Sequence, residues 1–238
     1  KDMDSRQAEV VHSLAKWKRM KLAQMSVLPG RGIYTDMNAL RPDEELDNIH
    51  SIYVDQWDWE KVITRENRNL DYLKLIVRSI VRASCDTNDR LHVRFPQLRV
   101  ELNPEVSFVT TQELEDLYPE LTGSQREKAF VAEHKTACIM QIGGKLRSGK
   151  PHDGRAPDYD DWQLNCDIFF WDEVLGRALE ISSMGIRVDA EALDRQLKLS
   201  GCDNRRELPF HKMLLNDALP LTIGGGIGQS RLCMLMMG

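Results

Sequence analysis

The chain has 238 residues and a formal net charge of −5, with 42% hydrophobic and 29% charged residues. These values are typical of a soluble globular protein with one large domain or two small ones. The negative net charge argues against a protein that coats a nucleic-acid duplex, which would carry a basic face. No signal peptide and no apolar run long enough to cross a bilayer is recognisable, so we expect a cytoplasmic protein without a membrane partner.

The cysteines and histidines exclude several kinds of site. The five cysteines are odd in number and none forms a Cys-x-x-Cys pair. This pattern favours buried free thiols in a reducing compartment over a disulfide framework or a zinc site. The six histidines show neither a His-Glu-x-x-His motif nor the context of a catalytic triad.

The first third of the chain predicts two helices and two strands. Over residues 9–23, Val10, Leu14 and Trp17 recur at helical spacing, which predicts one apolar helix face with Lys18 and Arg19 spread over the rest. A turn is expected at residues 29–32, which read PGRG. The other elements expected here are a strand that begins at 32, a strand over 50–60 and a helix over 69–85.

The rest of the chain continues as a mixture of helices and strands. Thr110 with Glu113, and Ser124 with Glu127, have the spacing of capping boxes, and Gly201 is placed to end a helix. We expect a strand and helix over 107–121, a helix over 124–135, a strand over 137–146, a polar loop over 150–162, two strands over 166–189, a helix over 190–200, and a last strand followed by a helix from about 229. Because no regular βαβ order is visible, the pattern favours an α+β fold with a mixed sheet.

Four glycines crowd the last predicted strand, in the stretch LTIGGGIGQSRLCML over residues 221–235. The stretch lacks the Lys-Ser or Lys-Thr of a Walker A loop, and Arg231 stands where a dinucleotide fingerprint needs its third glycine. The glycine pattern alone favours a bulged strand packed tightly under a helix. Arg231, in the first turn of the predicted helix, adds a guanidinium that could grip a phosphate or stack on a base.

Polar residues of the strand over 50–60 form a second candidate site. Successive strand residues face opposite sides, so Gln56 and Asp58 share one face and Trp57 and Trp59 the other. An amide beside a carboxylate could recognise an ammonium or an amino-acid head group. A solvated polar face of an amphipathic strand is the alternative.

Several more charged residues could take part in a site. The loop RAPDYDDW is dense in carboxylates, which could hold an amine or a metal but also suit a solvated loop. Asp167 and Glu180 lie on predicted strands, where carboxylates are disfavoured, and magnesium with nucleotide phosphates is a natural partner for them if they are buried. The arginines at 41, 155 and 231, the carboxylates at 58, 160, 167 and 180, and the lack of a nucleophile motif together suit nucleotide-dependent activation of a carboxylate.

Long strings of the sequence resemble the ammonia-dependent, type A asparagine synthetases, the aspartate–ammonia ligase family. The strings are EVVHSLAKWKR, ALRPDE, HSIYVDQWDWE, IGGKL, RAPDYDDW, SSMGIRVDA and TIGGGIGQSRLCML, in order along nearly the whole chain. The family is similar to the catalytic domain of class II aminoacyl-tRNA synthetases. The resemblance implies one catalytic domain over 1–238, of the α+β class, with a mixed, mainly antiparallel sheet flanked by helices, in a homodimer that binds no nucleic acid.

The resemblance also implies the reaction. Aspartate, ATP and ammonia would give asparagine, AMP and pyrophosphate through a β-aspartyl-adenylate, with Mg²⁺ as the cofactor. The alternatives are a class II aminoacyl-tRNA synthetase-like enzyme, which would need an anticodon-binding domain and a basic surface, and a non-catalytic amino-acid-binding paralogue.

Roles for individual residues follow from the same resemblance. Arg41, Lys18 and Asp58 would be catalytic. The residues implied for aspartate are Ser13, Lys18, Gln56, Asp58, Asp160, Ser183 and Arg187. Those implied for the nucleotide are Arg41, Glu44, Arg155, Tyr159, Gly226, Gly228 and Arg231. Asp167 and Glu180 would hold the magnesium. The family further implies a segment before residue 1, extra residues between Trp162 and Gln163, and a C-terminal tail.

Overall fold

The computed structural model describes residues 13–40, 47 and 51–238. The strands in this part are β1 (Gly32–Leu40), β2 (Tyr53–Val62), β3 (Ser107–Thr110), β4 (Thr136–Met140), β5 (Asp160–Asp172), β6 (Arg177–Arg187) and β7 (Thr222–Gly228). The described strands form a seven-stranded sheet in the order β1-β2-β7-β6-β5-β4-β3, and every pair is antiparallel except β3 with β4. This confirms the expected α+β fold with a mainly antiparallel sheet.

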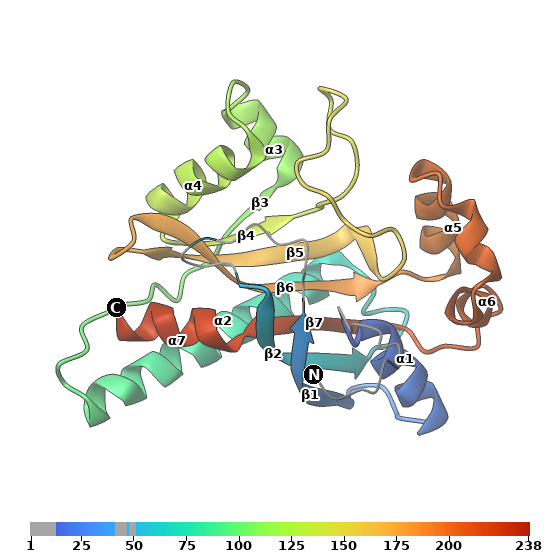
Figure 1. Ribbon diagram of the computed structural model, residues 1–238, viewed down its shortest axis with the longest axis horizontal. Helices are drawn as coiled ribbons and strands as arrows, with labels where there is room; N and C mark the ends of the chain where they lie inside the picture. The colour runs from blue at the N-terminus through green and yellow to red at the C-terminus, as the bar shows by residue number, and fades with distance from the viewer. Residues whose placement is uncertain (1–12, 41–46, 48–50) are drawn as a thin grey trace, which may run out of the picture.

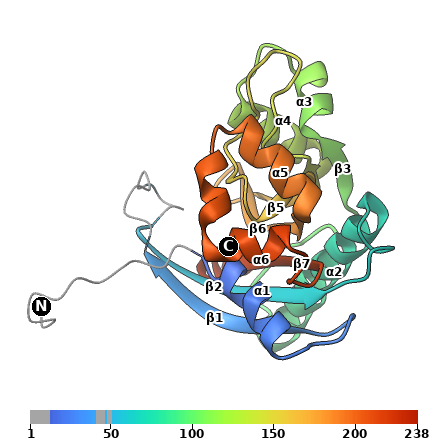
Figure 2. The same cartoon turned by 90° about the vertical axis from the view of Figure 1, so that its right-hand side faces the viewer.

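Helices flank the sheet on several sides (Figure 1). They are α1 (Ala15–Gln24), α2 (Leu70–Arg94), α3 (Thr111–Leu117), α4 (Gly123–His134), α5 (Ala190–Leu199), the 3-10 helix η1 (Asp203–Glu207), α6 (Pro209–Leu215) and α7 (Gln229–Met237). Figure 1 shows α2 and α7 on one face of the sheet and α3 with α4 beside β3 and β4. Figure 2 shows α5 and α6 together at one end of the molecule, close to α1. Within the described residues, no helix combines the length and apolar character needed to span a membrane.

The main core lies between the sheet and α2 with α7. Leu73, Val77 and Val81 of α2 are fully buried and pack against strand residues such as Ile168 and Leu179. These α2 residues follow the helical spacing predicted for 69–85, so that helix is confirmed, although it continues to Arg94. This core fixes β5 and β6 from one face. Their other face carries Phe169, which packs in a second core with Leu114 of α3 and Phe130 of α4, as well as polar side chains.

The helix α1 corrects the prediction of its apolar face. Lys18 and Arg19 are 0% and 1% exposed, whereas Trp17 is 49% exposed. Arg19 is buried because the Val188 and Pro220 carbonyls accept hydrogen bonds from its guanidinium at 2.7 and 2.9 Å. Periodicity of apolar residues cannot anticipate such partners, since they come from the far end of the chain.

The expected ends of several other elements are confirmed or corrected. The capping box of Thr110 and Glu113 is present at α3, and Gly201 follows α5 with a left-handed φ of 62°. The predicted box of Ser124 with Glu127 is wrong, because Thr122 with Gln125 caps α4 two residues earlier. β5 begins at Asp160, inside the expected loop over 150–162.

Candidate active site

Eight of the predicted site residues line one cavity of about 540 Å³. They are Gln56, Arg155, Tyr159, Glu180, Ser183, Gly226, Gly228 and Arg231. They come from β2, β6, β7, the start of α7 and the loop before β5, so the sheet order brings together segments far apart in the sequence. A second cavity, of about 640 Å³, lies beside Lys135 and Trp171 and is lined by none of the predicted site residues.

We call four charged residues the rim: Arg155, Glu180 and Arg231, which line the cavity, and Asp167, which pairs with Arg155. Arg155 forms an ion pair with Asp167, and the Nη1 atom of Arg231 donates a 3.1 Å hydrogen bond to the Glu180 carbonyl oxygen. The same Nη1 atom lies 3.8 Å from the Glu180 carboxylate. The rim therefore alternates two carboxylates with two guanidinium groups.

The two rim carboxylates lack full compensation. Burial, followed by the nearby charge of Asp167, raises the pKa of Glu180 to about 7. The Oδ1 atom of Asp167 is buried and has no hydrogen-bond partner among the described residues. Paired carboxylate oxygens of this kind suit a cation such as Mg²⁺. In the part of the chain that the structure describes, no group of three or more His, Cys, Asp or Glu side chains is arranged to hold a metal.

Next to the cavity lies a set of five charged side chains that we call the buried ionic cluster. Its members are Lys18, Asp58, Glu60, Asp160 and Arg187, each at most 5% exposed. Lys18 pairs with Asp58, and Arg187 pairs with both Glu60 and Asp160. Because water is excluded, each of these charges depends on its partners within the protein.

Burial shifts the pKa values of three members of this cluster, Lys18, Asp58 and Asp160, against their charged forms. It lowers the pKa of Lys18 and raises that of Asp58, and their mutual contact opposes both shifts. Burial also raises the pKa of Asp160, against the effect of Arg187. These shifts indicate groups held in place by the fold at a cost in desolvation.

The glycines of β7 make room for different neighbours on the two faces of the strand. A Cβ atom at Gly224 would lie 2.1 Å from Glu60 Oε2, and one at Gly226 would lie 2.7 Å from Gln56 Oε1. A Cβ atom at Gly225 would meet Met184 at 2.5 Å. At Gly228 the closest atom would be 3.6 Å away, which is an ordinary contact. Side chains of the protein therefore occupy the space over Gly226, whereas a Cβ atom at Gly228 would only touch the Arg231 side chain.

Among the predicted site residues that the structure describes, Ser13 lies away from these two groups. Ser13 is exposed at the start of α1, where its hydroxyl accepts a hydrogen bond from the Ala15 amide, and it does not line the cavity. Arg41 and Glu44 fall outside the described residues.

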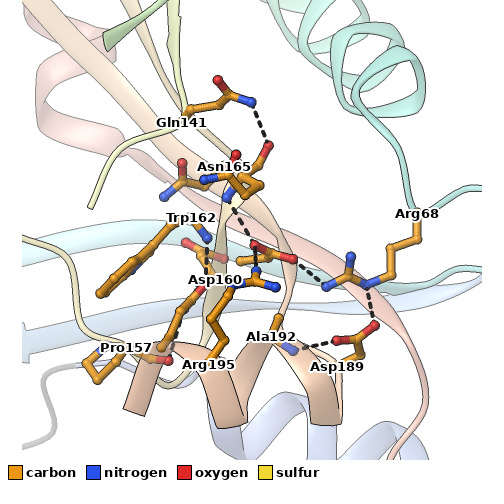
Figure 3. A network of polar contacts seen from close by, with 12 residues as sticks. Arg68, Gln141, Pro157, Asp160, Trp162, Asn165, Asp189, Ala192 and Arg195 are labelled. Carbon is orange, nitrogen blue, oxygen red and sulfur yellow. Dashed lines mark hydrogen bonds and ion pairs between the residues drawn. The ribbon is translucent and has the colours of Figure 1, made fainter. Parts of the chain in front are cut away.

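A network from α5 holds the segment that carries Tyr159 and Asp160 (Figure 3). The buried Gln196 side chain donates to the carbonyls of Pro157 and Asp160 at 3.0 and 2.9 Å, and accepts from the Trp162 amide at 2.9 Å. In Figure 3, Pro157, Asp160 and Trp162 lie together above and to the left of the helix that carries Ala192 and Arg195. The network fixes the backbone on both sides of the Asp160 side chain.

An arginine extends this network to the start of α2. Arg68 contacts Asp161 at 2.6 Å and Asp189 at 3.2 Å, and Asp189 caps α5 by accepting from the Ala192 amide. Figure 3 shows Arg68 reaching from beside α2 toward Asp189. The sequence analysis missed Arg68, Gln196 and Glu60. Only Glu60 had a local signal, since it follows Asp58 by two residues on the same strand face.

Comparison with known proteins adds independent information. The aspartate–ammonia ligase family model matches residues 1–238. An aspartate–ammonia ligase of Clostridium tetani is 59% identical over 237 residues, which are 100% of this chain and 70% of that protein. The enzyme of the same name from Levilactobacillus brevis is 57% identical over 237 residues, 100% of this chain and 71% of that protein.

Solved structures share the fold at low sequence identity. An aspartyl-tRNA synthetase from Entamoeba histolytica superposes with a TM-score of 0.69 at 16% identity, covering 96% of this chain and 48% of that one. An asparaginyl-tRNA synthetase from Pyrococcus horikoshii gives a TM-score of 0.68 at 15% identity, with 100% and 55% covered. The chain spans about half the length of these synthetases. At such identity the likeness shows the fold alone, and it is the expected class II synthetase fold.

Proposed function

The chain belongs to the aspartate–ammonia ligase family, and we propose on this basis that it joins ammonia to the side-chain carboxylate of aspartate at the expense of ATP. The observation that carries the proposal is the contact between two unlike regions: a cavity with guanidinium groups and a cluster of buried, opposed charges. The first suits a polyphosphate, and the second suits a small zwitterion.

We place the nucleotide in the cavity. Arg155 and Arg231 stand where they can offset phosphate charge, because both guanidinium groups line it. Tyr159 adds an aromatic wall, and burial raises its pKa to about 12, so the phenol stays neutral. Gly228 lines the same cavity at the end of β7.

We place aspartate between Gln56, Ser183 and the buried ionic cluster. Gln56 and Ser183 line the cavity, and Asp58 and Arg187 lie behind it. Asp58 and Asp160 would attract the ammonium group of aspartate, and Arg187 would attract a carboxylate. Lys18 pairs with Asp58 and so fixes the position of that carboxylate. Arg41 and Ser13 remain predicted members of the site.

The proposed chemistry needs no nucleophile from the protein. The β-carboxylate of aspartate attacks the α-phosphorus of ATP, pyrophosphate leaves, and a β-aspartyl-adenylate forms. Ammonia then attacks the activated carbonyl carbon, AMP leaves, and a proton is lost from the nitrogen. The guanidinium groups stabilise the negative charge that develops on the transferring phosphoryl group.

Mg²⁺ is proposed to bind at Asp167 and Glu180. The unpartnered Oδ1 atom of Asp167 and the raised pKa of Glu180 fit a site that a cation would complete. With two protein carboxylates, the remaining ligands would be phosphate oxygens and water. The ion would supply charge neutralisation for the phosphates.

A homodimer is also proposed. An apolar groove of about 420 Å³ runs between β2, α2 and α7, lined by Trp57, Trp59, Ile76, Ile80 and Leu232 among others. Trp57 is 41% exposed there, which suits coverage by a second copy. Sedimentation analysis should give twice the mass of one chain.

Product analysis tests the proposed reaction. The purified protein should form AMP from ATP only when aspartate and ammonia are both present, and asparagine should accumulate in equal amount. Formation of ADP, or AMP formation that ignores ammonia, contradicts the proposal.

A further inference from the structure

Glu60 is a buried carboxylate that lines no part of the cavity but holds a residue of the proposed aspartate site. It is 1% exposed on β2, and its Oε1 accepts a hydrogen bond from Arg187 Nε at 3.1 Å while its Oε2 accepts one from Arg187 Nη2 at 2.8 Å. This is a bidentate pair along one edge of the guanidinium group. Glu60 and Arg187 are 127 residues apart in the chain, so the pair also ties β2 to β6.

The bonds to Glu60 and Asp160 use only some of the N–H donors of Arg187. A guanidinium group has five N–H donors. Glu60 takes the Nε–Nη2 edge, and Asp160 accepts from Nη1. Tyr159, which lines the cavity, has its ring centre 5.7 Å from the Arg187 Cζ atom. Arg187 therefore stands beside the cavity wall with its plane fixed and with one N–H of each Nη atom left over from these bonds.

We propose that Glu60 is a positioning residue that fixes Arg187 for recognition of the aspartate carboxylate. This inference rests on the proposed function, because it assumes that aspartate is the ligand of Arg187. Without Glu60, the long arginine side chain has several rotamers, and Asp160 is its remaining charged partner in the buried ionic cluster. The fixed geometry means that the ligand does not have to order the arginine when it binds.

Gly224 supports the same inference from the opposite side of the ion pair. A Cβ atom at this position would lie 2.1 Å from Glu60 Oε2 and 2.5 Å from Arg187 Nη2, both far inside van der Waals contact. The glycine therefore makes room for the pair and also for the Trp59 carbonyl oxygen of β2, which would lie 2.6 Å from the same Cβ atom. Its replacement offers a way to disturb the pair without removing a charge.

The first experiment compares the wild type with Glu60→Gln and Glu60→Asp. Glu60→Gln keeps one acceptor oxygen but removes the charge, and Glu60→Asp keeps the charge but shortens the reach. Binding of aspartate and of ATP is measured separately by calorimetry, together with both KM values. We expect the Kd and KM for aspartate to rise at least tenfold in Glu60→Gln and less in Glu60→Asp, while those for ATP change less than threefold.

The outcomes separate the possibilities. Equal losses for aspartate and ATP would assign Glu60 a purely structural role and overturn the inference. Unchanged or tighter aspartate binding in Glu60→Gln would also overturn it, because Glu60 would then compete with the substrate. Failure of the wild type to bind aspartate would instead contradict the proposed function. ATP binding by the variants serves as the check that they are folded.

The second experiment uses Gly224→Ala with Gly225→Ala as its matched control. A Cβ atom at Gly225 would point to the other face of β7, where it would lie 2.5 Å from the Met184 Cβ atom and 2.8 Å from the Ser183 carbonyl oxygen of β6. Both variants strain β7, but only Gly224→Ala reaches the Glu60–Arg187 pair. A greater loss of aspartate affinity in Gly224→Ala supports the inference, and equal losses contradict it. Should either variant fail to fold, the Glu60 variants decide the question alone.

Discussion

The buried ionic cluster and the rim contain the same kinds of charge, but they differ in how far their side chains are exposed. In the buried ionic cluster every charged group has an ion-pair partner in the protein, and exposure is at most 5%. On the rim, the Arg231 and Glu180 side chains are 24% and 36% exposed and line the cavity. The difference in exposure indicates that the buried ionic cluster is closed within the fold, whereas the rim faces a ligand in the cavity.

The two regions should therefore respond differently to mutation. Removing a charge from the buried ionic cluster leaves its partners buried without a counter-charge. This should lower the stability of the fold as well as the activity. Removing a charge from the rim should change ligand affinity with little loss of stability, since solvent can compensate part of it.

Arg187→Met gives the largest expected effect. It leaves Glu60 and Asp160 buried without their cation, which should lower the free energy of unfolding by about 3–5 kcal/mol. Urea unfolding measures this change. Arg195→Ala is the control, because Arg195 is 46% exposed and lies 3.3 Å from Asp161, so it should cost less than about 1 kcal/mol. Equal effects of the two variants would contradict the claim that the buried ionic cluster depends on its internal ion pairs for stability.

Gln196→Leu tests whether α5 supports the buried region through hydrogen bonds alone. It removes the bonds to Pro157, Asp160 and Trp162 while keeping a side chain of similar size. Leaving these backbone groups unsatisfied should lower the free energy of unfolding by about 1–3 kcal/mol. The KM for aspartate should rise as well, because the segment that carries Asp160 loosens. A stability loss with an unchanged KM would limit Gln196 to a structural role.

Arg231→Lys tests the rim. The substitution keeps the positive charge but loses the planar fork, so kcat/KM for ATP should fall about tenfold, equivalent to ~1.4 kcal/mol. The free energy of unfolding should stay close to that of the wild type. Unchanged kinetics with ATP would refute the nucleotide role of Arg231.

The smallest expected effect is a pH dependence that comes from Glu180. Its pKa of about 7 lies above the ordinary value of 4.5, so the folded protein binds a proton that the unfolded chain releases. Without added Mg²⁺, Glu180 should therefore make the fold less stable as the pH rises from about 4.5 to 7. Thermal unfolding across this range should show a flatter profile for Glu180→Gln, while Glu173→Gln, on the surface, should follow the wild type.

Local patterns in the sequence were enough to predict much of the fold. The apolar period of α2, the Thr110–Glu113 capping box and the glycine after α5 all depend on neighbouring residues, and all are present. α1 failed this kind of prediction, because Lys18 and Arg19 are buried by partners from β2 and from the segments after β6 and before β7. Apolar spacing alone carries no information about those partners.

Part of the site could also be predicted from patterns among neighbouring residues. Gln56 and Asp58 share a strand face, and extending that alternation by two residues reaches Glu60. Gln196 gave no such signal, since its role depends on α5 packing against the segment over 157–162. The resemblance to a family indicated which residues line the cavity. Their arrangement around the glycines could not be predicted, because it follows from the order of the strands in the sheet.

The position of β7 in the sheet has a consequence for how the molecule folds. β2 ends at Val62 and β7 begins at Thr222, yet the two strands pair directly in the middle of the sheet. The hairpin of β5 and β6 closes over a short turn, but the pairing of β2 with β7 must close a loop that contains most of the chain. Its glycines also give β7 a weak preference for the extended state. We therefore expect β7 to join the sheet late, so that the part of the molecule proposed to perform the chemistry is also the last to form.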